Sequence, residues 1–185
     1  MTRRLLAIMA VGVCVCGRAE VKPAKILQDG MVVEWTKPLT LWGTADPNEK
    51  FDIKINNVRK SRVQADSNGK WEVKLPALKP GGPYTIQIGD KTLKDVLSGD
   101  VVLCSGQSNM ELYVYRVDDM FHDLISNYSN DNIRQFIAPK NINFEGPAED
   151  LSGGNWEKTT PTRSSNFSAL GYFIAMEMNS KTGRP

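Results

Sequence analysis

The sequence has few of the residues that cross-link a chain or bind metals. It contains three cysteines and one histidine in 185 residues. Two of the cysteines, Cys14 and Cys16, lie in a segment that we expect to be removed, so an internal disulfide is excluded from the chain that remains. A single histidine, with no carboxylates clustered at metal-ligand spacing, argues against a metal site. We expect the folded chain to depend on its apolar core alone.

The sequence also lacks a long apolar run and an excess of one charge. The longest apolar stretch, residues 5–16, is shorter than the roughly 20 residues that a membrane-spanning helix needs. The formal net charge is +2 at pH 7, and the lysines and arginines are scattered along the chain. A nucleic-acid-binding protein would concentrate its basic residues on one face. We therefore expect neither a nucleic-acid partner nor a membrane span in the mature chain; oligomeric state is left open.

The first 19 residues have the pattern of an export signal. A basic start that contains Arg3 and Arg4 precedes the apolar run, and Gly17 and Ala19 supply the small residues that a signal peptidase reads. The pattern predicts cleavage after Ala19 and a periplasmic or extracellular protein. A lipoprotein signal, with modification of a cysteine at the end of the run, is the alternative.

Residues 24–98 have the residue pattern of β-structure. Short β-prone or alternating apolar and polar runs recur, with turn residues such as glycine, proline and asparagine between them. The expected strands cover 31–35, 39–42, 51–55, 71–75 and 84–88. Strands at this spacing predict an all-β sandwich of immunoglobulin-like or jelly-roll-like type.

The rhythm changes in residues 99–185. Residues 101–104 form a continuous apolar run, which is typical of a strand buried on both faces of a parallel sheet. A helix at 120–128, a strand at 133–137 and a last helix capped by Asn166 or Ser168 would follow. This order predicts a right-handed β-α-β unit. Two strands are too few for a stable parallel sheet, so we interpret the region as the incomplete start of an α/β domain.

A serine-rich turn follows the predicted buried strand. Residues 105–111 read Ser-Gly-Gln-Ser-Asn-Met-Glu. Ligands of open α/β sheets bind at the carboxyl ends of the strands, where a serine can expose its hydroxyl and direct its own N–H at an oxyanion. Spacing alone leaves two interpretations open: a nucleophile turn or an ordinary polar turn.

Residues 104–111 resemble the first sequence block of the sialate O-acetylesterase family, a branch of the SGNH hydrolases. The resemblance continues in order through Ile26–Val33, Leu41–Lys50, Gly69–Trp71, Pro80–Tyr84, Gly99–Val101, Asn132–Phe136 and Asn166–Phe173. It implies a β-sandwich followed by the N-terminal part of a flavodoxin-like SGNH domain. It also implies hydrolysis of O-acetyl esters on sugars without metal or cofactor.

The resemblance assigns roles to residues of the block. It implies that Ser108 is the nucleophile and that its N–H is one oxyanion donor, and we expect Gln107 and Asn109 to bind substrate. The family takes its other oxyanion donors, its histidine base and the acidic partner of that base from later blocks that these 185 residues do not contain. A secreted non-catalytic β-sandwich module that binds glycan or protein is the alternative function. The sugar is left open.

Other residues that could take part in catalysis or binding are expected to have structural roles instead. His122 is predicted to lie on a helix surface, one turn from Asp118 or Asp119, rather than to act as a base. Those two aspartates are expected to begin a solvated helix rather than bind metal. Cys104 is expected to be buried in the core. The tryptophans at 35, 42 and 71 are expected in the core rather than on a sugar-stacking surface.

Overall fold

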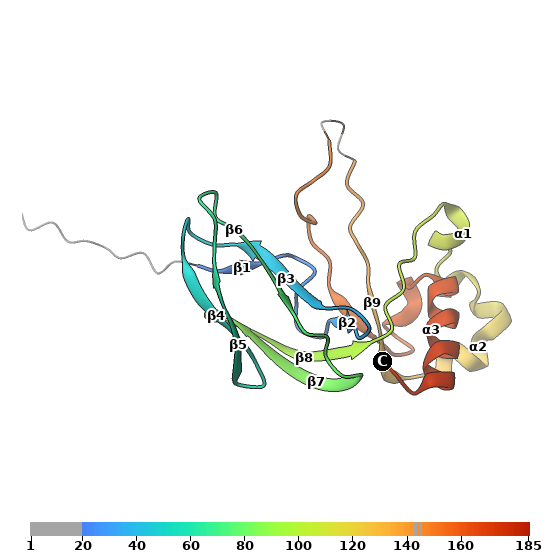
Figure 1. Cartoon of the computed structure of the whole chain (residues 1–185). Helices are drawn as coiled ribbons and strands as arrows, with labels where there is room; N and C mark the ends of the chain where they lie inside the picture. Colours follow the sequence, from blue (N-terminus) through green and yellow to red (C-terminus); the bar gives the residue numbers. More distant parts are fainter. Residues whose placement is uncertain (1–19, 143, 145) are drawn as a thin grey trace, which may run out of the picture.

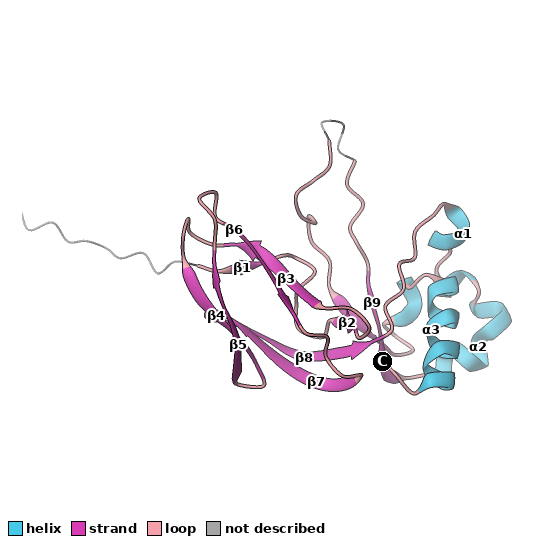
Figure 2. Cartoon of the chain, in the orientation of Figure 1, coloured by secondary structure: helices cyan, strands magenta, loops and turns pink. Residues whose placement is uncertain are grey.

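The computed structural model describes residues 20–142, 144 and 146–185. The export signal predicted over residues 1–19 lies outside the described residues. The described chain is mostly β with few helices, and its strands and helices gather at opposite ends (Figures 1 and 2). In the part of the chain that the structure describes, no helix is both long and apolar enough to span a membrane.

Two sheets form the β-rich end. The smaller sheet has the order β1-β3-β6 and is antiparallel; the larger has the order β2-β8-β7-β4-β5, and only its β2–β8 pair is parallel. Their strands are β1 (Lys22–Pro23), β2 (Val32–Glu34), β3 (Leu39–Thr44), β4 (Lys50–Ile55), β5 (Val58–Gln64), β6 (Lys70–Leu75), β7 (Gly81–Ile88) and β8 (Lys91–Gly99). All five strands predicted in this region are confirmed.

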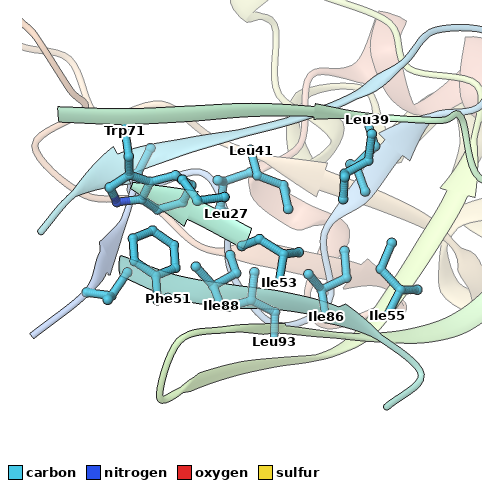
Figure 3. Close-up of a cluster of buried hydrophobic side chains, with 14 of the residues drawn as sticks. Leu27, Leu39, Leu41, Phe51, Ile53, Ile55, Trp71, Ile86, Ile88 and Leu93 are labelled. Carbon is cyan, nitrogen blue, oxygen red and sulfur yellow. The ribbon is translucent and has the colours of Figure 1, made fainter. Parts of the chain in front are cut away.

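Alternation along the strands explains why the two sheets share a core. In β4 the side chains of Phe51, Ile53 and Ile55 are buried, while the residues between them are partly exposed. Side chains from both sheets meet in one apolar cluster (Figure 3). The Trp71 ring packs edge-on against Phe51, with centroids 5.2 Å apart. Trp71 is thus a core residue, as predicted.

Among the strands that the sequence did not predict, β5 and β8 were missed for different reasons. Strand β5 is polar and largely exposed, so it carries almost no apolar alternation. It follows a two-residue turn in which Asn56 and Asn57 both have positive φ, the geometry that a tight hairpin requires. In β8 the alternation is interrupted at Asp95, whose φ is +56°, and the β7–β8 register shifts twice.

The buried strand predicted over residues 101–104 is not present. This segment has no strand assignment, and Val101, Val102 and Leu103 are 45%, 50% and 89% exposed. An apolar run becomes a buried strand only between neighbouring strands and under a covering layer. The only strands beyond β8 in the described residues, β9 (Asn130–Phe136) and β10 (Trp156–Thr159), pair antiparallel with each other. The predicted β-α-β unit is therefore wrong for this structure.

The helical end has its own small core. Its elements are α1 (Ser108–Glu111), the 3-10 turn η1 (Val114–Arg116), α2 (Asp118–Asn127), the 3-10 turn η2 (Ser164–Asn166) and α3 (Ala169–Thr182). The buried residues of this end are Val114, Val117, Ile125, Phe167, Ala169 and Tyr172. Both predicted helices exist as α2 and α3. In α2, Ile125 is the one buried residue, so the apolar face of this helix is mostly exposed or partly exposed.

Helix α3 begins and ends as its sequence indicates. Ser168 caps its N-terminus by accepting a hydrogen bond from the Gly171 amide, and Gly183 closes it in the left-handed conformation with φ of +67°. Of the two caps left open by the sequence, Ser168 is the one used.

Several contacts join the β9–β10 hairpin and the residues before it to strand β8 and to the loop between β1 and β2. The guanidinium of Arg134 donates to the Gly30 carbonyl at 2.7 Å and to the carboxylate of Asp95 at 3.0 Å. The indole of Trp156 donates to the Ile26 carbonyl at 2.9 Å, and Gln28 donates to the Gly154 carbonyl at the same distance. Side chains on both sides of this contact donate the hydrogen bonds, and most of the acceptors are backbone carbonyls.

A second junction lies where β8 leads into the helical end. Arg184 forms an ion pair with Asp100 at 3.0 Å and lies over the Trp35 ring, 5.0 Å from its centroid. The Trp35 indole also donates to Asp100 at 2.9 Å. Partial burial favours the neutral form of Asp100, but the hydrogen bonds from Arg184 and Trp35 outweigh it and lower its pKa. This cluster holds the end of the chain against the start of the exposed segment.

Candidate functional site

The predicted nucleophile lies at the surface of the helical end. Ser108 is the first residue of α1 and is exposed, as are Gln107 and Asn109 on either side of it. Gln107 has an extended backbone, and its carbonyl accepts the amides of Met110 and Glu111 at 3.0 and 3.1 Å. Ser108 is therefore accessible from solvent, which a nucleophile requires.

The segment that follows the predicted nucleophile is connected to the start of α3 by a row of hydrogen bonds. The Ala169 amide donates to the Leu112 carbonyl at 2.7 Å, and the Val114 amide donates to the Phe167 carbonyl at 2.9 Å. Ser168 lies between these two bonds, and its hydroxyl donates to the Met110 carbonyl at 2.6 Å. The sequence predicted Ser168 only as a helix cap. Its second hydrogen bond left no sequence signal, because it depends on two segments 58 residues apart.

The long connection between β9 and β10 contacts α1, the helix that begins at Ser108. Lys140, in this connection, forms an ion pair with Glu111, the last residue of α1. The hydrogen bond from Lys140 is the main cause that lowers the pKa of Glu111. Both side chains are substantially exposed, so the pair contributes little to stability. Its importance is positional, since it brings Lys140 of this connection beside the motif.

The single histidine is paired on its own helix rather than with Ser108. His122 is on α2 with 67% of its side chain exposed, and its Nδ1 is 3.0 Å from the Asp118 carboxylate on the same helix. That hydrogen bond raises the pKa of His122. Among the described residues, no side chain hydrogen-bonds to Ser108. The prediction of a surface histidine paired one turn away is confirmed.

The prediction for Cys104 is wrong. The thiol is exposed rather than buried, because the segment that carries it lacks a covering layer. It faces α3 so closely that a Cβ added to Gly171 would lie 2.9 Å from its sulfur. The other tryptophans are also less buried than expected: Trp42 is 40% exposed and Trp35 is half-buried.

Two hollows of the molecule have linings that do not include Ser108. One, of about 380 Å³, lies between α2 and α3 and is lined by Leu124, Tyr128, Phe173, Met176, Glu177 and Ser180. Another, of about 290 Å³, lies beside Arg134 and Lys158 where the hairpin meets β7 and β8. Within the described residues, no group of three or more His, Cys, Asp or Glu side chains is arranged to hold a metal ion.

Comparison with known proteins identifies the class of this fold. The chain is similar to the crystal structure of a carbohydrate acetylesterase from Xanthomonas citri, with a TM-score of 0.84 and 35% sequence identity. The match covers 90% of this chain and 38% of that protein. The fold is thus close to that of a carbohydrate acetylesterase.

Sequence comparison is more specific about the family. The chain is 29% identical over 150 residues to a sialate O-acetylesterase of Homo sapiens, covering 74% of this chain and 28% of that protein. It is 35% identical over 108 residues to the sialate O-acetylesterase of Rattus norvegicus, covering 54% and 20%. The resemblance to the sialate O-acetylesterase family is confirmed. The chain spans about a quarter of the length of these curated relatives. No family model matches the chain.

Proposed function

We propose that this chain supplies the nucleophile turn of an esterase that removes O-acetyl groups from sugars. The observation that carries the proposal is the exposed Ser108 in the motif of residues 104–111, within a chain similar to carbohydrate acetylesterases in sequence and fold. In this role residues 24–98 are the β-sandwich domain and residues 99–185 are a portion of the SGNH-type α/β hydrolase domain. Gln107 and Asn109 are the substrate-binding neighbours.

The proposed reaction proceeds in two acyl transfers. The Ser108 oxygen attacks the acetyl carbonyl carbon while a general base takes its proton, and the carbonyl oxygen becomes an oxyanion that the Ser108 N–H stabilises. The intermediate collapses, the bond to the sugar oxygen breaks, and that oxygen receives the proton. The base then takes a proton from water, the water oxygen attacks the acetyl carbon, the bond from that carbon to the Ser108 oxygen breaks, and the serine oxygen receives the proton as acetate is released. Serine, base and hydrogen-bond donors suffice for these steps.

We propose that the base comes from outside these 185 residues. His122, the one histidine, is paired to Asp118 on its own helix and makes no hydrogen bond to Ser108 in the described structure. A positioned base contributes typically 10²–10⁴-fold to such a reaction, so the 185-residue chain should turn over slowly. The curated relatives are several times longer, which leaves room for the base in such proteins.

The test compares the chain with a version extended along its reading frame. Acetate release from an acetylated sugar is measured for both proteins and for the Ser108→Ala form of the longer one. We expect activity in the extended protein and its loss in Ser108→Ala, while Ser105→Ala, an exposed serine of the same turn, stays active. Full activity of Ser108→Ala would refute the nucleophile. Inactivity of every form would favour the binding-module alternative.

We also propose that the chain is exported and cleaved after Ala19. The support is the basic start, the short apolar run and the small residues of the first 19 positions. N-terminal sequencing of secreted protein should begin at Glu20. A lipid-modified Cys14 or Cys16 would instead establish the lipoprotein route, and a mature protein that retains Met1 would refute export by this signal.

A further inference from the structure

The helix that carries the nucleophile has little to hold it in place. Helix α1 is four residues long, none of its residues is buried, and no side chain caps its N-terminus. A single helical turn is unstable by itself because nucleation costs more than one hydrogen bond returns. The position of Ser108 must therefore be set by contacts from outside α1.

Ser168 makes such a contact from a well-packed position. Its residue is 9% exposed, and its hydroxyl both donates and accepts a hydrogen bond. It donates its proton to the Met110 carbonyl at 2.6 Å and accepts the Gly171 amide at 3.3 Å. The same residue forms an isolated β-bridge with Tyr113. One side chain thus links the start of α3 to a residue two positions after Ser108.

We infer that Ser168 is a positioning residue for Ser108: its hydroxyl couples the nucleophile helix to the rigid start of α3. This inference rests on the proposed function for its catalytic consequence. Met110 contributes a carbonyl from the C-terminal half of α1, where helices leave acceptors unpaired. The Lys140–Glu111 ion pair is exposed and cannot fix α1 to the same degree.

The catalytic consequence follows from the sensitivity of acyl transfer to displacement. A misplacement of about 1 Å can cost roughly 10²-fold in rate. Loss of the Ser168 hydroxyl should therefore lower kcat by about 10- to 100-fold. The hydroxyl is bonded to the backbone of the nucleophile turn and is mostly buried, so we expect KM to change less than about twofold.

Three substitutions separate positioning from helix capping. Ser168→Ala removes both hydrogen bonds. Ser168→Asp keeps an acceptor for the Gly171 amide but has no proton for the Met110 carbonyl. Ser168→Thr keeps the hydroxyl and should restore both the order of α1 and kcat. Ser180→Ala is the matched control, because Ser180 is an exposed serine of the same helix.

The first measurement uses the 185-residue chain and does not depend on activity. Backbone ¹⁵N relaxation should give order parameters near about 0.85 for Asn109–Glu111 in the wild type, falling below about 0.6 in the Ala and Asp variants. The first turn of α3 should loosen in Ser168→Ala only. Both Ser168→Thr and Ser180→Ala should match the wild type. An α1 that stays ordered in both the Ala and Asp variants would overturn the inference and leave Ser168 as a cap.

The second measurement is kinetic and uses the extended, active protein. A fall in kcat at nearly constant KM in the Ala and Asp variants, with rescue by Ser168→Thr, supports positioning. A change in KM alone contradicts it. If the wild-type extended protein has no esterase activity, the proposed function fails, and the order parameters still decide whether Ser168 holds α1.

Discussion

Replacement of Arg134 by methionine is the most informative test of how the β9–β10 hairpin is joined to the β-rich end. The Arg134 side chain is 2% exposed, and its guanidinium donates to the carbonyls of Gly30 and Asp95 and to the Asp95 carboxylate. Methionine is unbranched and similar in length, so it preserves much of the apolar packing while it removes every donor. The substitution therefore isolates the polar contribution of this junction.

The expected loss can be worked out from the acceptors left behind. A buried acceptor without a partner costs about 1–3 kcal/mol. Removal of one partner of a fully buried ion pair costs about 3–5 kcal/mol. Asp95 is 41% exposed and keeps an ion pair with Lys158 at 3.1 Å, so water and Lys158 recover part of this energy. We expect a net destabilisation of about 2–4 kcal/mol. For a chain of this length each kcal/mol lowers Tm by about 2–4 °C, which predicts a decrease of about 5–15 °C.

Thermal denaturation followed by circular dichroism measures this effect. Arg59→Met is the matched control, because Arg59 forms an ion pair with Asp52 in the large sheet at 3.3 Å but is 53% exposed. Its loss should cost at most about 1 kcal/mol. If Arg134→Met and Arg59→Met lower Tm equally, the reasoning that burial gives the Arg134 junction its strength is refuted.

The remaining predictions address packing, pH and the histidine. Gly43→Ala should cost about 1–3 kcal/mol in urea unfolding, because the new Cβ would lie 2.1 Å from a backbone carbonyl of β1; an unchanged midpoint would contradict that contact. Burial acts to raise the pKa of Asp100, but its hydrogen bond from Arg184 prevails and lowers it. Ionised Asp100 therefore stabilises the folded state at neutral pH, and this contribution is lost as the pH falls below about 4. Asp100→Asn should flatten that part of the stability profile. The pKa of His122, followed by NMR, should lie above 6.5, and Asp118→Asn should lower it toward 6.5. An equal pKa in both proteins would exclude the ion pair. His122→Gln should leave esterase activity of the extended protein unchanged.

Much of the β-rich end could be predicted from the sequence because its information is local. Alternation of apolar and polar residues located β4 and β6, and glycine, proline and asparagine marked the turns between strands. The same holds for α3, where Ser168 and Gly183 provide the caps at either end. The role of Ser108 as nucleophile was predicted by resemblance and stays a prediction; the structure shows that Ser108 is exposed.

Residues 101–104 show where local information fails. Their apolar run predicts a buried strand, yet burial is a property of the neighbours, and the described structure supplies no strand beside them. Exposure of Cys104 follows from the same cause. For β5 the error is the opposite one, a strand that is present but was not predicted. This polar edge strand is defined by its pairing with β4 rather than by its own pattern of residues.

The sequence by itself determined the apolar and polar alternation of β4 and β6, the glycine that ends α3 and the presence of the serine motif, because each depends on residues close together in the chain. Only the tertiary structure decided which distant groups meet. Arg134 contacts Asp95 across 39 positions, and Ser168 contacts Met110 across 58. Such bonds form when packed elements bring a donor within about 3 Å of an acceptor, a condition that no pattern in the chain records.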